Sequence, residues 1–144
     1  MKNFLLAVLC LSVALFSGCA TVSPADDASI QGHWKGQEVV NGQALASWLT
    51  LSGSDVDFHG ADSRDWFRGT FTVNQRMNPK QLITVISLST LPQSAGKTVN
   101  AVYRVAPGAD DQATLIVTFS QPGDPYMPAS LNDRHARQIV FTKD

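Results

Sequence analysis

The polar side chains of residues 55–59 are the first group in this sequence that could do chemistry. Asp55, Asp57 and His59 alternate with Val56 and Phe58, so on a β-strand the three polar side chains share one face. Carboxylate oxygen and imidazole nitrogen can bind a metal ion. One strand supplies such ligands from one side only, however, and the pattern is typical of a strand with a solvated face. We therefore predict no metal site here.

Ser120, Ser130, Asp133 and His135 are the remaining candidates for catalysis. A serine nucleophile needs a base and an orienting carboxylate, and it often sits in a Gly-x-Ser-x-Gly turn, which is absent from this sequence. Asp133 and His135 are near each other in the chain, which gives no indication that one orients the other. We predict that the protein is not an enzyme and needs no cofactor.

The first nineteen residues have the layout of a secretory signal. A basic start at Lys2 precedes the apolar segment Phe4–Phe16, which ends in Ser17-Gly18-Cys19. This order of charged, apolar and small residues is typical of a signal peptide, and the apolar segment is shorter than the roughly 20 residues of a membrane-spanning helix. Residues 1–18 are therefore predicted to be removed on export.

The end of this signal, Leu15-Phe16-Ser17-Gly18-Cys19, resembles the lipobox of bacterial lipoproteins. The resemblance implies that Cys19 becomes the acylated first residue of the mature protein. Two or more acyl chains, palmitate among them, would give stable anchoring in a membrane. Ala20 after the cysteine, in place of Asp, implies the periplasmic side of the outer membrane if the cell has two membranes. The alternative is an ordinary signal peptide that ends by chance at a cysteine.

The mature chain is predicted to consist of a tether and one domain. Residues 19–29 form the lipidated tether, in which Pro24 and Asp26-Asp27 discourage regular structure. Residues 30–144 form the domain, which has no internal disulfide because Cys19 is the only cysteine left. The whole chain has 11 basic and 12 acidic residues without a basic cluster, which excludes the electrostatic footprint of a nucleic-acid-binding protein.

Alternation of apolar and polar residues with a period of two runs through this domain, and no segment has helical periodicity. Such alternation is typical of strands with one buried face, and Asn41-Gly42 is a strong hairpin signal. Short strands at this spacing indicate a sandwich or a barrel, and closure into a barrel removes exposed edges. The eight expected strands lie near 31–40, 45–52, 54–59, 65–74, 81–89, 97–106, 113–119 and 137–142.

Several short motifs follow one another along the domain: Gln31-Gly32-His33-Trp34, Asn41-Gly42, Gly69-Thr70-Phe71-Thr72-Val73, Pro79-Lys80, Gly96-Lys97-Thr98 followed by Tyr103, and Phe119-Ser120-Gln121-Pro122-Gly123. Their order resembles that of lipocalins and of small bacterial lipocalin-like domains. The resemblance implies an all-β, antiparallel, up-and-down barrel of about eight strands, with Trp34 packed at its closed end. The name of this family describes a fold, and a fold alone does not define a function.

A barrel of this size either holds one small molecule or is filled by its own side chains. Six aromatic residues could line such a space, and Trp34, Phe71 and Tyr103 are the candidate binding residues for a small apolar ligand. The six are Trp34, Trp48, Trp66, Phe67, Phe71 and Tyr103. Tyr126 and Met127 lie in the irregular segment 121–136, which either covers a barrel end as a lid or simply crosses between the last two strands. The short domain favours an interior that is filled or nearly filled.

Trp66 precedes Phe67, so one of these two aromatic side chains must point outward on a strand. An exposed aromatic side chain is a contact for a partner molecule. Two functions therefore stay open. One is a membrane-anchored lipoprotein whose barrel binds a small apolar ligand or envelope component. The other is a protein-interaction or inhibitor module of the envelope that has no ligand cavity.

We predict that replacing Cys19 with Ser abolishes acylation and leaves a mis-processed precursor, because the thiol is the acylation site and a serine hydroxyl is not an equivalent nucleophile. Metabolic labelling with radioactive palmitate measures this directly. Label retained by the Cys19→Ser variant would contradict the lipoprotein assignment.

Overall fold

The computed structural model describes residues 27–144. The predicted signal peptide (1–18), Cys19 and most of the predicted tether lie outside the described residues. Among residues 27–144, none of the helices is long and apolar enough to cross a membrane. The eight strands are β1 (Gly32–Val40), β2 (Gln43–Ser52), β3 (Asp55–His59), β4 (Trp66–Asn74), β5 (Lys80–Ser89), β6 (Thr98–Pro107), β7 (Ala113–Phe119) and β8 (Arg137–Lys143).

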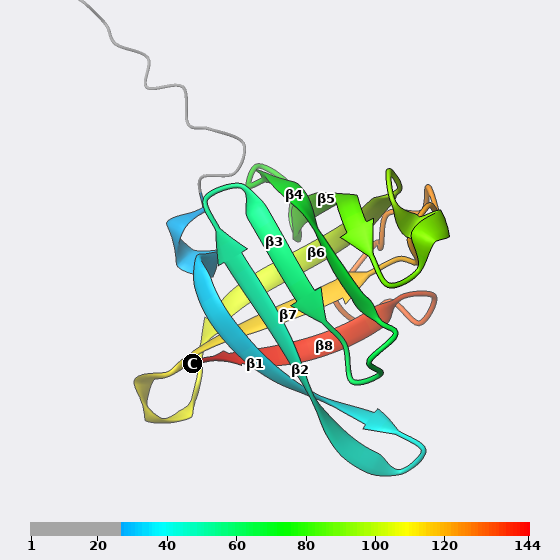
Figure 1. Cartoon of the computed structure of the whole chain (residues 1–144). Coiled ribbons are helices and arrows are strands. Elements are labelled where there is room, and N and C mark those ends of the chain that lie inside the picture. Colours follow the sequence, from blue (N-terminus) through cyan, green and yellow to red (C-terminus); the bar gives the residue numbers. More distant parts are fainter. Residues whose placement is uncertain (1–26) are drawn as a thin grey trace, which may run out of the picture.

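These strands form a closed barrel in which each strand is antiparallel to the next, and β8 pairs with β1 to complete the ring (Figure 1). This confirms the all-β, antiparallel, up-and-down barrel predicted from the sequence. The β1–β2 pair extends as a long hairpin beyond the rest of the barrel (Figure 1). Its turn has Asn41 at φ 51° and Gly42 at φ 79°, the left-handed conformation for which these two residue types are favoured.

The alternation seen in the sequence separates the interior of the barrel from its outer wall. In β4, Gly69 and Phe71 are buried, whereas Arg68, Thr70 and Thr72 are exposed. The same pattern holds in the neighbouring strands, so the inward residues form one apolar core. The largest fully buried side chains are Trp34, Tyr103, Phe71 and Phe141.

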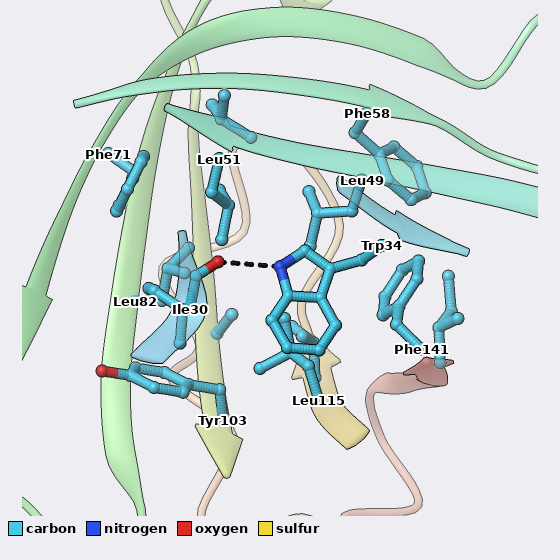
Figure 2. Packing of buried hydrophobic residues seen from close by; sticks show 14 residues of the cluster. Ile30, Trp34, Leu49, Leu51, Phe58, Phe71, Leu82, Tyr103, Leu115 and Phe141 are labelled. Atoms are coloured by element: carbon cyan, nitrogen blue, oxygen red, sulfur yellow. Dashed lines mark hydrogen bonds between the residues drawn. The ribbon is translucent and has the colours of Figure 1, made fainter. Parts of the chain in front are cut away.

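A short turn before β1 closes one end of the barrel. The 3₁₀ turn η1 (Ala28–Ile30) places Ile30 fully inside, and the Trp34 Nε1 donates a hydrogen bond of 2.7 Å to the Ile30 carbonyl (Figure 2). Lys143, at the end of β8, has its Nζ 5.2 Å from the centre of the Trp34 ring. The same Nζ donates to the Gln31 carbonyl at 2.9 Å, so the last strand is tied to the first turn.

The segment between β7 and β8, which we call the crossing segment, runs along the outer wall. This is one of the two arrangements predicted for it, and the other, a lid over a barrel end, is not formed. Thr118 Oγ1 donates to the Leu131 carbonyl at 2.6 Å, and Gly123 N donates to the Thr98 carbonyl at 2.9 Å. Val102 and Thr118 point outward in their strands, yet both are buried. The crossing segment therefore packs against the outer side of β6 and β7.

We predict that Trp34→Ala lowers the free energy of unfolding by about 3–5 kcal/mol, because truncating a buried aromatic side chain leaves a cavity. Trp34 is 1% exposed, and the matched control, Trp48, is 48% exposed. Trp48→Ala should change the unfolding free energy by less than about 0.5 kcal/mol, as is usual for surface positions. Urea unfolding of both variants measures the difference, and equal midpoints would contradict the packing described here.

Candidate functional site

A buried carboxylate completes the closed end of the barrel. Asp27 accepts hydrogen bonds from the Tyr103 hydroxyl at 2.7 Å, from Lys80 Nζ at 3.1 Å and from the backbone and hydroxyl of Ser29. Burial opposes the ionisation of Asp27, but these hydrogen bonds outweigh it and lower the pKa of the carboxyl below its ordinary value. Burial, followed by the bond to Asp27, raises the pKa of the Tyr103 hydroxyl far above its ordinary value.

This network changes the expected boundary between tether and domain. The sequence places the start of the domain at Ile30, with Asp27 in an irregular tether. Asp27 instead caps the η1 turn and is buried against β5 and β6 through Lys80 and Tyr103. A carboxylate with four donors is held by the fold, so residues 27–29 belong to the domain.

The interior of the barrel holds a small apolar cavity of about 40 Å³. Pockets that take drug-sized ligands have roughly 300–1,000 Å³, so the interior is nearly filled. Of the predicted ligand residues, Trp34, Phe71 and Tyr103 come together in the core, but they do not line this cavity. Its lining is apolar apart from Thr84 and consists of Leu49, Leu51, Val56, Phe58, Phe67, Leu82, Thr84, Val99, Ala101, Val117, Phe119 and Phe141.

Tyr126 and Met127 lie away from this cavity, in the crossing segment. The Tyr126 hydroxyl donates to the Asp133 carboxylate, and the same carboxylate accepts bonds from Ala129 N and His135 N. Asp133 therefore orders the crossing segment through its backbone and through Tyr126. Asp133 accepts a hydrogen bond from the backbone N–H of His135. In a catalytic pair the carboxylate would instead bind the imidazole ring of the histidine.

A charged cluster covers the other end of the barrel, opposite Trp34. Arg137 donates to both Glu38 and Asp65, and its guanidinium carbon lies 5.9 Å from the Phe58 ring centre and 5.4 Å from that of Phe119. Burial works against the charge of Arg137, but the two carboxylates outweigh it and raise the pKa of the guanidinium. An ion-paired cation therefore lies over the apolar rings at this end.

Two tryptophans form a row on the outer wall. Trp48 in β2 lies opposite His59 in β3, and His59 lies opposite Trp66 in β4. Trp48 is about half exposed, and the His59 and Trp66 ring centres are 5.8 Å apart. The sequence predicts that either Trp66 or Phe67 points outward; the structure places Phe67 against the core and Trp66 on the wall.

Asp57 orders the side chains of this row. It precedes His59 by two residues in β3 and therefore points to the same outer face. One carboxylate oxygen accepts a hydrogen bond from Trp66 Nε1 at 2.9 Å and lies 3.0 Å from His59 Nε2. The other accepts a bond from Arg68 Nε at 2.8 Å. Asp57 thus fixes three neighbouring side chains, and we name Trp48, Asp57, His59, Trp66 and Arg68 the aromatic wall.

A shallow polar groove of about 330 Å³ runs beside the aromatic wall. It forms where a β-bulge shifts the register between β4 and β5 at Arg68 and Gly69, a feature that often opens a sheet near functional sites. Ser87, the extra residue of the bulge, donates from its hydroxyl to the Arg68 carbonyl at 3.2 Å. The lining residues are Thr50, Ser52, Asp55, Val56, Asp57, Arg68, Gly69 and Ser87.

Asp55, Asp57 and His59 point to the same outer face, as their spacing predicts. Within residues 27–144, no group of three or more acidic, histidine or cysteine side chains is arranged to hold a metal ion. Asp57 is already bound to Trp66 and Arg68. These residues therefore act in this structure as parts of the wall and groove.

Comparison with family models, with curated proteins and with solved structures gives no match. The site is therefore described by its own geometry. The sequence offers Trp48 as a possible lining residue of an interior cavity, and this is wrong, because its side chain points outward from β2 and is about half exposed. Sequence reasoning also missed the cluster of Glu38, Asp65 and Arg137. The cluster joins residues that are 72 and 99 positions apart, so only the pairing of the strands reveals it.

We predict that Asp27→Asn lowers the unfolding free energy at pH 7 by about 1–3 kcal/mol, because the donors around it lose a charged acceptor. The native pKa of Asp27 lies below the ordinary value of 3.8. The stabilisation is therefore full above that value and is lost as the pH falls through the native pKa.

The measurement is urea unfolding of the wild type and the Asp27→Asn variant from pH 7 down to the acid limb, with Asp110→Asn as the control. Asp110 is an exposed acid. The difference in unfolding free energy between the wild type and Asp27→Asn should become smaller as the pH falls. A difference that stays constant with pH would contradict an ionised Asp27 in the native state.

Proposed function

We propose that this protein is a lipid-anchored binding module of the cell envelope, which uses its outer wall to hold an envelope component. In this proposal Cys19 carries the lipid and residues 20–26 connect the anchor to the folded domain. The barrel is a rigid scaffold, and the aromatic wall with its groove is the binding face.

The nearly filled interior is the observation that carries this proposal. A cavity of about 40 Å³ is far smaller than the roughly 300–1,000 Å³ of ordinary ligand sites. Both barrel ends are also held by charged networks, Asp27 with Tyr103 and Lys80 at one end and Arg137 with two carboxylates at the other. Two tryptophans, meanwhile, lie on the outer wall, where aromatic residues are common binding anchors.

A second candidate function is the binding of a small apolar molecule in the interior. It is supported by the apolar cavity itself and by Phe67 and Phe119, which line it and are only partly buried. Movement of Arg137 away from Phe58 and Phe119 would open this end. In the closed barrel, however, the cavity would accept a molecule of only a few atoms.

The two functions differ in the size of the molecule that enters the barrel. We predict that xenon shifts the methyl resonances of Leu49, Val99 and Val117, because an apolar cavity stays dry and takes up such atoms. N-phenyl-1-naphthylamine should leave these resonances unchanged, because its naphthalene and phenyl groups do not fit in about 40 Å³. Methyl NMR of the full chain in detergent measures the effect of both probes. Because each signal belongs to one residue, entry of a probe into the barrel is distinguished from its partition into micelles.

Val39 and Val140 are exposed apolar residues on the outside, and their methyl groups report non-specific contact with either probe. Shifts of the interior methyl groups with N-phenyl-1-naphthylamine would overturn the proposed function in favour of a ligand carrier. Tyr126→Ala combined with Met127→Ala should not alter either result, since the crossing segment is not a lid.

A further inference from the structure

The spacing of the two outer tryptophans indicates the kind of molecule that fits them. Trp48 and Trp66 are each opposite His59, so their backbone positions are two strand spacings apart, about 10 Å. An extended β-1,4-linked glycan repeats its disaccharide over a closely similar distance. Alternate sugars of such a chain present the same face, so two sugars separated by one can each meet an indole ring.

The surface chemistry of the aromatic wall also fits a sugar. A pyranose ring has a face of C–H groups, which packs on the electron-rich face of an indole, and an edge of hydroxyl groups. Trp48 is about half exposed and offers the open indole ring. Trp66 is only partly exposed, because Arg68 lies over its ring, and it is held by its hydrogen bond to Asp57. A side chain that is already fixed loses little conformational entropy when a ligand binds.

The groove beside the tryptophans also contains polar groups. Arg68 donates from Nε to Asp57, and its guanidinium carbon lies 5.5 Å from the Trp66 ring centre. Asp55 is exposed, and within residues 27–144 its carboxylate makes neither a hydrogen bond nor an ion pair. The Thr50 hydroxyl shares a hydrogen bond of 2.9 Å with His33 Nδ1, and Ser52 adds a second hydroxyl to the groove. These donors and acceptors can bind sugar hydroxyls along the edge of the chain.

The charge of this surface argues for a neutral ligand. Arg68 is compensated by Asp57, and Asp55 adds a negative charge, so the groove lacks the excess of positive charge that binds phosphate or nucleic acid. A protein partner that buries apolar area needs a contiguous apolar patch. Here His59 lies between the two tryptophans, which interrupts such a patch.

We propose that the aromatic wall and its groove bind an extended, neutral β-1,4-linked oligosaccharide. This inference rests on the proposed function and names the partner class of that same wall. One sugar stacks on Trp48 and the next but one meets Trp66, while Arg68 and Asp55 bind hydroxyl groups from the groove. The shortest ligand that reaches both rings has three sugars.

The test is NMR of the indole N–H signals of the full chain in a polyoxyethylene detergent, which carries no sugar head group. Chitohexaose and cellohexaose are the extended probes, with and without acetamido groups, and maltohexaose is the coiled α-1,4-linked control. At least one extended probe should shift the indole signals of Trp48 and Trp66. The signal of Trp34 is an internal reference, because this ring is buried in the core.

Variants then assign the binding to the wall. Trp48→Ala should weaken binding about tenfold, the effect expected for the loss of one aromatic anchor, and Trp48→Phe should restore part of it. Tyr126→Ala removes an aromatic side chain that is also exposed but lies in the crossing segment, so it should not change the affinity. The disaccharide of the bound series should bind more weakly than its hexamer.

Absence of binding by both extended probes would overturn the inference, as would equal binding of maltohexaose or an affinity that is insensitive to Trp48→Ala. These outcomes are distinct from failure of the proposed function, which is marked by entry of N-phenyl-1-naphthylamine into the barrel. If the interior excludes that probe and neither glycan binds, the wall is a binding face for another class of partner and the glycan inference alone fails.

Discussion

The filling of the barrel interior is the constraint on which the rest of this structure depends. Eight strands enclose a space only just wide enough for their own inward side chains. Ile30, Trp34, Phe71 and Tyr103 occupy the closed end completely, and the other inward residues leave about 40 Å³. The interior therefore has no room for a large ligand, and the proposed binding face lies on the outside of the barrel.

The two ends of the barrel are sealed by different physical means. At the Trp34 end, hydrogen bonds converge on the Ile30 carbonyl and on the buried carboxylate of Asp27. At the opposite end, Arg137 joins two carboxylates above phenylalanine rings. Removing one partner of such a network leaves an uncompensated charge, so both networks stabilise the closed ends of the barrel.

The strands could be predicted from the sequence because burial in a barrel alternates residue by residue. The alternation of Phe67, Gly69, Phe71 and Val73 with polar residues marks β4 within about one residue of its observed ends. The Asn41-Gly42 turn was similarly readable, because its backbone conformation requires these residue types. Local patterns of this kind need no knowledge of the partner strand.

The site was only partly predictable because its contacts cross the barrel. The shared face of Asp55, Asp57 and His59 follows from spacing within one strand, whereas the contacts of Asp57 with Trp66 and Arg68 depend on the register between β3 and β4. The contact of Asp27 with Tyr103 joins residues 76 positions apart. The crossing segment packs on the outer side of β6 and β7, a choice that no local pattern specifies.

The central claim is that the outer wall of β2–β4, and not the interior, is the binding face. Cross-saturation NMR between isolated native envelope material and the full chain tests this claim without assuming a ligand. The account predicts signal loss at outward positions of the wall, such as Thr50, Asp57 and Arg68. Loss centred instead on Phe58, Phe67 and Phe119 at the Arg137 end would contradict it.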